Sequence, residues 1–137
     1  MASNGERDIV MLIQANDKSW VDEWLDGIRD KRTRARIERQ IDKLGRGLGV
    51  PKNLKDVSEL KIDLGPGYRV YYALWDQKTV VVLIGGGDKS SQSRDIASAR
   101  QLWTDFEDSG YPAAALRPRK EADVGAQEAP DAGGGAQ

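Results

Sequence analysis

The stretch SELKIDLGPGYRVYYALW, residues 58–75, decides the fold that we expect for this chain. Apolar and charged residues alternate from 59 to 64, which is typical of a strand with one buried face. Gly65-Pro66-Gly67 is a strong turn signal, and a second strand follows at 68–75. We therefore predict a β-hairpin.

The expected register of this hairpin places charged residues beside an aromatic ring. A loop over 65–67 sets Asp63 opposite Arg69 and Lys61 opposite Tyr71, and these odd-numbered positions share one face. Cations next to an aromatic ring suit a phosphate backbone with a stacked base. The alternative is a surface ion pair between Asp63 and Arg69, which would contribute at most about 1 kcal/mol.

The remaining elements follow from spacing on both sides of the hairpin. Apolar residues at helical intervals predict two helices before it and one after it, and Asn16-Asp17 is the expected cap of the first. The expected elements are a strand at 8–14, helices at about 17–29 and 31–44, a loop at 51–56, strands at 59–64, 68–75 and 79–84, and a last helix. This helix is expected to turn Ile96, Ala99, Trp103 and Phe106 inward, with Arg100 either inward or at the edge of the buried face. This order predicts an α+β fold, with a small antiparallel sheet packed against two amino-terminal helices and one carboxyl-terminal helix.

Basic residues form a stripe along the second expected helix. Steps of four and three residues line them along one side. The stripe is suited to phosphates or to an acidic segment of a partner, and an ordinary solvated face is the alternative. Its members are Arg32, Arg36, Arg39, Lys43 and Arg46.

A glycine-rich segment follows the strand at 79–84. It is expected to form a loop over 85–91, and it is not a Walker phosphate loop, because Asp88 stands where a glycine should precede Lys89. Free backbone N–H groups near Lys89 would still make a phosphate seat. Capping of the last helix by Ser90 or Ser91 is the other interpretation, and the two are compatible.

Composition limits the chemistry that the chain can perform. It has no cysteine and no histidine, which excludes a thiolate zinc site, a cysteine nucleophile and Ser-His-Asp hydrolysis, and we expect neither a metal nor a cofactor. From residue 29 to 100 there are sixteen Lys and Arg against nine Asp and Glu. This basic middle favours a polyanionic partner.

The chain is expected to hold one domain, over 8–109, between disordered segments at 1–7 and 110–137. It has no apolar run near the roughly 20 residues that cross a bilayer and no secretion-type start. We therefore expect a cytoplasmic protein with no membrane partner.

Four strings together resemble one protein family. WLDGIRD at 24–30, SELKID at 58–63, GPGYRVYY at 65–72 and GGDKSSQSRDI at 86–96 look like the addiction module killer proteins, a HigB-like branch of the RelE/ParE toxin superfamily. The resemblance covers about residues 8 to 107. It implies a RelE/ParE-like fold and a toxin of a type II toxin–antitoxin system.

The resemblance also implies residue roles. Lys61, Arg69 and Lys89 match basic positions of the site, and Arg94 stands nearest to a position where RelE-like enzymes carry a tyrosine. Asp63 stands where those enzymes carry a second lysine. The implied catalytic set is Lys61, Arg69, Lys89 and Arg94, and the implied RNA-binding set is Tyr71, Arg32, Arg36, Arg39 and Lys43.

A mechanism without histidine fits this set. The 2'-hydroxyl of RNA can attack the adjacent phosphorus, so that the protein needs to hold the geometry and to neutralise charge. Arg69 and Lys89 would stabilise the phosphorane oxygens. Lys61 is the candidate base only if neighbouring cations lower its pKa.

The expected activity is therefore ribosome-dependent cleavage of messenger RNA. The expected partners are the ribosome, the message and a cognate antitoxin, a small DNA-binding protein. The first alternative is a ParE-like toxin, since ParE-like relatives inhibit DNA gyrase without catalysis. The second alternative is a structural module that has kept the fold and lost toxicity.

Overall fold

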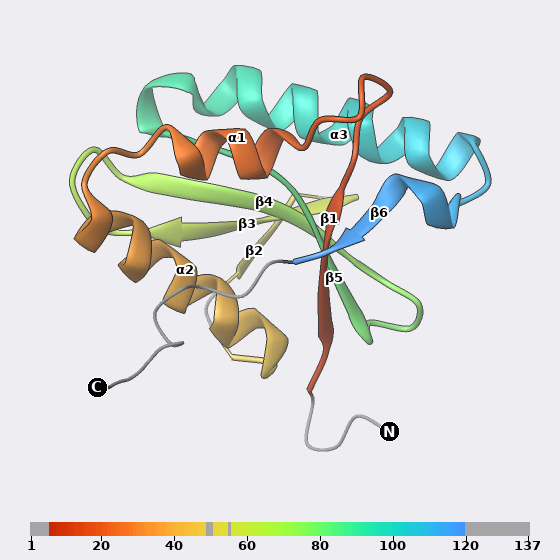
Figure 1. Cartoon of the computed structure of the whole chain (residues 1–137), viewed down its shortest axis with the longest axis horizontal. Helices are drawn as coiled ribbons and strands as arrows, with labels where there is room; N and C mark the ends of the chain where they lie inside the picture. The colour runs from red at the N-terminus through yellow and green to blue at the C-terminus, as the bar shows by residue number, and fades with distance from the viewer. Residues whose placement is uncertain (1–5, 49–50, 55, 120–137) are drawn as a thin grey trace.

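The computed structural model of the chain describes residues 6–48, 51–54 and 56–119. A six-stranded sheet with the order β2-β3-β4-β5-β1-β6 forms its centre (Figure 1). All neighbouring strands are antiparallel except β1 and β5, which are parallel. The strands are β1 (Asp8–Leu12), β2 (Pro51–Leu54), β3 (Val57–Ile62), β4 (Tyr68–Trp75), β5 (Val80–Asp88) and β6 (Leu116–Pro118).

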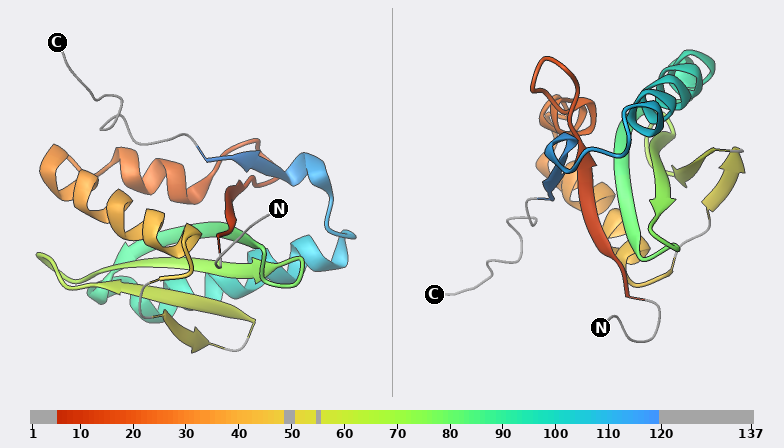
Figure 2. Two further views of the ribbon diagram at one scale, coloured as in Figure 1. Left: turned by 90° about the horizontal axis from the view of Figure 1, so that it is seen from below. Right: turned by 90° about the vertical axis from the view of Figure 1, so that its right-hand side faces the viewer.

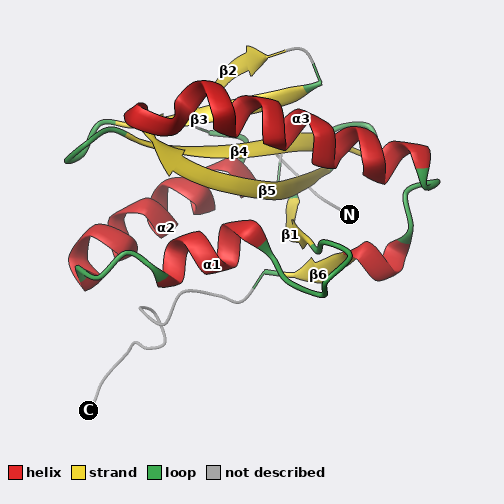
Figure 3. Cartoon of the chain, turned by 90° about the horizontal axis from the view of Figure 1, so that it is seen from above, coloured by secondary structure: helices red, strands yellow, loops and turns green. Residues whose placement is uncertain are grey.

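Helices cover both faces of this sheet. α1 (Trp20–Asp26) and α2 (Lys31–Gly45) lie on one face, and α3 (Gln92–Asp108) lies on the other (Figures 2 and 3). Short 3-10 turns η1 (Lys89–Ser91) and η2 (Ala113–Ala115) flank α3. The expected α+β class is confirmed.

Each face of the sheet has its own apolar core. The face toward α1 and α2 buries even-numbered residues of β3 and β4, such as Leu60 and Val70, against Ile37 and Ile41 of α2. The face toward α3 buries Ala73 and other odd-numbered residues against α3. Since both faces of the central strands are covered, a charged residue on either face needs a buried partner.

The first helix begins later than expected. Ser19 is its N-cap, with Oγ accepting a hydrogen bond from the Asp22 N–H at 3.2 Å, so the prediction that Asn16-Asp17 caps it is wrong. Asp17 instead adopts a positive φ of 65° in the turn before the helix. The second helix begins as expected, with the Asp30 carboxylate accepting from the Arg32 N–H at 3.0 Å.

The hairpin forms, but with a longer loop. Ile62 pairs with Tyr68 and Lys61 pairs with Arg69, so that the loop runs from 63 to 67 and the expected register is wrong by two residues. Asp63 therefore lies in the loop and does not face Arg69. A shift of two residues keeps side chains on the same face, so the predicted sharing of one face by Lys61 and Arg69 is confirmed.

Two strands lie where loop or disorder was expected. β2 pairs with β3 within the expected loop at 51–56, and the Arg100 guanidinium of α3 donates to the Leu54 carbonyl at 2.7 Å. β6 pairs with β1, so the boundary expected at 110 is wrong for the residues up to Arg119. Of the segments expected to be disordered, 1–7 and 110–137, residues 1–5 and 120–137 lie outside the described residues.

The glycine-rich segment is strand rather than loop. Gly85, Gly86 and Gly87 belong to β5 and pair with Tyr71, Val70 and Arg69 of β4. A Cβ atom on Gly85 would lie 2.1 Å from the Trp20 ring, and one on Gly86 would lie 2.2 Å from the Trp24 ring. The glycines are therefore needed for close packing of α1 against β5, because any side chain at these positions would collide with the indole rings.

None of the helices in the described residues is both long and apolar enough to cross a bilayer.

Candidate functional site

Two rows of paired residues define one end of the sheet on the face toward α3. Lys61, Arg69 and Gly87 form one row across β3, β4 and β5, and the row of Glu59, Tyr71 and Gly85 lies beside it. Residues directly opposite one another lie about 5 Å apart at Cα. Three separate stretches of sequence therefore meet here, under the first turn of α3.

A buried ion pair lies at the centre of this end. Nε of Arg69 is 2.7 Å from Oε2 of Glu59, and these side chains are only 7% and 3% exposed. The Gln92 amide at the start of α3 donates to the same carboxylate at 2.9 Å. The pair therefore ties β3 and β4 to α3.

A second carboxylate, that of Asp95, is buried against Gly87 of β5. Asp95 of α3 lies so close to Gly87 that a Cβ atom there would be 2.0 Å from its Oδ2. The Ser91 hydroxyl donates to this oxygen at 2.5 Å. Glu59, Arg69 and Asp95 are the buried charged residues of the described part of the chain, and all three belong to this cluster.

Tyr71 is also closed off from solvent. Its ring stacks on that of Trp20 with centroids 6.3 Å apart, and its side chain has no exposed surface. Burial, and then the carboxylates of Glu59 and Asp95, raise the pKa of the Tyr71 phenol above its ordinary range. Neither the Tyr71 hydroxyl nor Nη1 of Arg69 has a hydrogen-bond partner among the described residues.

Burial changes the roles that the sequence suggested for two residues. We expected Arg69 to contact phosphate and Tyr71 to stack on a base, but neither side chain reaches the surface. Arg69 instead neutralises a buried carboxylate, and Tyr71 packs under an indole ring. Their predicted direct contact with RNA is therefore wrong for this structure.

Exposed cations surround the buried cluster. The Lys61 side chain is 60% exposed and its Nζ lies 3.7 Å from Oδ1 of Asp63, an arrangement that solvent screens. Lys89 and Arg94 are also exposed. A Cβ atom on Gly67 would lie 3.8 Å from both Cβ of Lys89 and Nη1 of Arg69, so Lys89 and Arg69 both lie beside Gly67 of the hairpin loop.

The expected phosphate seat at the start of α3 is filled by the protein itself. The Asp88 carboxylate accepts hydrogen bonds from the Ser90 N–H at 2.8 Å and from the Ser90 hydroxyl. These bonds, that of the Ser90 hydroxyl first, lower the pKa of Asp88. Asp88 is thus the cap of η1, and its carboxylate stands where a phosphate would bind. Ser91 is the N-cap residue of α3, as one of the two expected positions, but its side chain makes no capping hydrogen bond.

The basic stripe of α2 lies on the other face of the sheet from α3 (Figure 3). One of its members approaches the end of the sheet, because Arg36 and Gln40 line a small pocket of about 180 Å³ with Lys61 and Asp63. Arg36 and Lys61 therefore lie in one pocket beside the hairpin, which we call the notch. Arg32, Arg39 and Lys43 of α2 do not line this notch and are not part of the cluster under α3.

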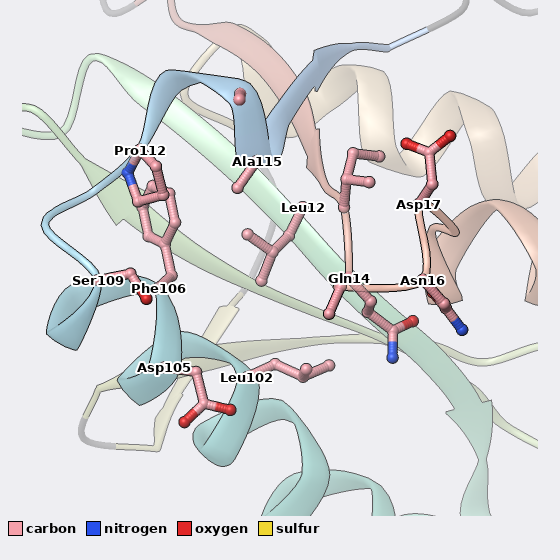
Figure 4. Close-up of a pocket in the computed structure, with 13 residues that line it drawn as sticks. Leu12, Gln14, Asn16, Asp17, Leu102, Asp105, Phe106, Ser109, Pro112 and Ala115 are labelled. Atoms are coloured by element: carbon pink, nitrogen blue, oxygen red, sulfur yellow. The ribbon is translucent and has the colours of Figure 1, made fainter.

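A larger pocket of about 670 Å³ lies at the opposite end of α3 (Figure 4). Its floor includes Leu12, Leu102 and Phe106, and Asp17 and Asp105 stand at its rim. No Lys or Arg of the described residues lines it. An apolar floor with an acidic rim does not suit a phosphate backbone, so this pocket is separate from the candidate site.

Three residues of this site were missed by sequence reasoning. Glu59 lies on the charged side of the alternating segment 59–64, and the spacing of the last helix did not mark Gln92 or Asp95 as buried. The signal that could have indicated them is Gly87. It pairs with Arg69 of β4, and because it has no side chain it leaves room for the Asp95 carboxylate of α3. Among the described residues no group of three or more acidic, His or Cys side chains is arranged to hold a metal ion.

The geometry defines a small α+β protein in which a buried ionic cluster is surrounded by exposed cations at one end of the sheet. No known family model matches the sequence. An uncharacterized protein of Haemophilus influenzae is 42% identical to this chain over 95 residues, which cover 67% of this chain and 94% of that protein. The chain belongs to the same family as this Haemophilus influenzae protein.

Proposed function

We propose that this protein is the toxin of a type II toxin–antitoxin system, related to the RelE/ParE superfamily, and that it cleaves messenger RNA on the ribosome in the cytoplasm. The single observation that supports this most is the meeting of Lys61, Arg69 and Lys89 at one end of the sheet. Two of these cations are exposed, and the third is held beneath them.

The chemistry of the proposed step needs little from the protein. The 2'-hydroxyl gives its proton to the candidate base and attacks the adjacent phosphorus, the bond from phosphorus to the 5'-oxygen breaks, and that oxygen takes a proton from water. The products carry a 2',3'-cyclic phosphate and a 5'-hydroxyl. Lys89 and Arg94 would neutralise the charge that develops on the phosphorus oxygens, Lys61 is the candidate base, and Arg36 at the notch would bind a neighbouring phosphate.

Arg69 acts differently from the expected mechanism. Because it is buried against Glu59, we assign it a positioning role, in which it holds β3, β4 and α3 together beneath the two lysines. Removing it would displace the cations rather than remove a phosphate contact.

The proposal is tested by inducing the protein in a bacterial host and by mapping the 5' ends of its transcripts. Growth arrest with new 5'-hydroxyl ends within coding sequences is expected for the unchanged protein, and both effects should be lost in Lys61→Gln with Lys89→Gln. A matched control is Lys31→Gln with Lys78→Gln, since both lysines are exposed, Lys31 at the start of α2 and Lys78 in the turn between β4 and β5. Equal loss in the control pair, or arrest with intact transcripts, would refute the assignment.

The second candidate is a toxin that binds DNA gyrase and has no catalytic activity. The burial of Arg69 and Tyr71 favours it. The nuclease hypothesis expected these two residues to contact RNA, and both are inaccessible. This candidate predicts inhibition of gyrase supercoiling by the purified protein, with no new transcript ends.

The proposed partner for either activity is a small DNA-binding antitoxin with an acidic segment. Its acidic side chains would face the exposed cations of α2 and of the hairpin. Co-expression of an antitoxin from an adjacent gene should restore growth, and failure of any adjacent gene to do so would count against the pairing.

A further inference from the structure

We propose that the carboxyl-terminal residues 120–137 of this chain bind its own basic α2 face, where they compete with any acidic or nucleic-acid partner. The basic α2 face consists of Arg32, Arg36, Arg39, Lys43 and the C-cap residue Arg46. The tail residues themselves lie outside the described part of the chain. The inference therefore rests on the helix face, on the place where the described chain ends, and on charge.

The arginines of the basic α2 face are exposed, and its lysine is half-buried. The apolar side of α2 is covered, since Ile37, Ile41 and Leu44 are buried in the core. No carboxylate of the described residues forms an ion pair with any of the five cations. Cations at spacings of three and four residues repel one another, so that an anionic segment laid over them would be stabilised.

The end of the described chain is anchored directly beside this face. Nη1 of Arg119 forms an ion pair with Asp42, and Nη2 lies 3.9 Å from Oε1 of Glu38 and 3.4 Å from the Glu38 carbonyl. The Arg119 side chain is only 10% exposed. Glu38 and Asp42 precede Arg39 and Lys43 by one residue each, which is one step of about 100° around the helix. The chain therefore leaves the described structure at the border of the basic α2 face.

The charge and the length of the tail fit this position. Residues 120–137 carry Glu121, Asp123, Glu128 and Asp131 against the single cation Lys120. Eighteen extended residues span about 60 Å, whereas the fifteen residues of α2 are about 22 Å long. The tail can therefore cover the whole face, and because it is tethered its effective concentration there is in the millimolar range.

The other surface that has room for a segment does not suit this tail. The pocket at the far end of α3 has carboxylates at its rim, contributed by Asp17 and Asp105, and it would repel an acidic segment. Asp105, Glu107 and Asp108 further place negative charge at that end of α3, where the helix dipole is also negative. Charge therefore directs the tail to α2.

The full-length chain allows a direct test, because it contains no cysteine. A nitroxide attached to Ala129→Cys reports, by paramagnetic relaxation in NMR, which amides lie near the tail. At 0.1 M salt we expect loss of amide signals along α2 and little change along α3, which serves as the internal control. At 1 M salt, where the Debye length falls from about 10 Å to about 3 Å, the α2 signals should return.

A charge-neutral tail separates electrostatic docking from mere proximity. In the variant with Glu121→Gln, Asp123→Asn, Glu128→Gln and Asp131→Asn, the folded part is unchanged and the α2 signals should be retained at 0.1 M salt. Equal relaxation of α2 and α3, or the same α2 relaxation in the neutral variant, would overturn the proposal. So would an added single-stranded RNA that shifts the α2 amides equally with the acidic and the neutral tail, since no competition would then exist. These readouts do not depend on toxicity, so the proposed function can fail without affecting them.

Discussion

Breaking the buried pair of Glu59 and Arg69 should destabilise the folded protein. Glu59→Gln keeps the size of the side chain but removes its charge, which leaves the Arg69 guanidinium in a site that is 7% exposed. Breaking a buried pair in this way typically costs 3–5 kcal/mol. We expect about 3 kcal/mol here, at the lower end, because the Asp95 carboxylate remains in the same cluster and compensates part of the charge.

Urea unfolding of a double-mutant cycle measures this effect. Glu59→Gln and Arg69→Met should each lower the free energy of unfolding, whereas the double variant should lose much less than the sum, because neither charge is left alone. A coupling free energy of about 2 kcal/mol is expected, which is within the range for residues in direct contact. Additive losses, or a loss below about 1 kcal/mol for Glu59→Gln, would refute the reasoning that the pair is buried and mutually dependent.

Three further changes test other parts of the structure. Ser19→Ala should lower the free energy of unfolding by about 1 kcal/mol in urea titrations, because the cap of α1 is lost. Tyr71→Phe should reduce the loss of stability above pH 10. Because its pKa is raised, the phenol of the folded protein keeps its proton at a pH where the unfolded chain releases it, and this difference costs the folded state about 1.4 kcal/mol per pH unit. A Phe variant whose free energy of unfolding falls with the same slope at alkaline pH would contradict this. Gly85→Ala should cost about 1–3 kcal/mol by collision with Trp20, whereas Gly27→Ala, where a Cβ atom has 3.5 Å of room, serves as its control in thermal unfolding.

The sequence predicted the elements whose pattern is local. Alternation and turn residues identified the hairpin, and helical spacing identified α2 to within one residue. The register was wrong because Gly65-Pro66-Gly67 is only part of a loop that begins at Asp63. The faces were nevertheless right, since a two-residue shift preserves them.

The glycine-rich strand could not be recognised from its composition. Glycines usually mark loops, and the reason that they lie in β5 is the position of two indole rings from α1, which is a tertiary contact. β2 and β6 were missed for a related reason. They are short edge strands that contain Pro51 and Pro118, and proline is tolerated at a sheet edge although it argues against a central strand.

The candidate site was predicted in its residue types but not in their exposure. The charged residues on odd positions of β3 and β4 suggested a solvated face, whereas α3 covers that face and buries Glu59 and Arg69. Lys61 and Lys89 remained exposed beside them. Only the packing of α3 on the sheet distinguishes the buried pair from the two exposed lysines. No local sequence pattern encodes that packing.

The central proposal, cleavage of message beneath two exposed lysines, is tested most directly with purified components. Translating ribosomes, a defined message and the full-length protein are incubated together, and the 5' ends are mapped by primer extension. We predict cuts within the coding region that carry 5'-hydroxyl ends, that require ribosomes, and that disappear with Lys61→Gln and Lys89→Gln. Intact message at protein concentrations that stop growth would contradict the proposal.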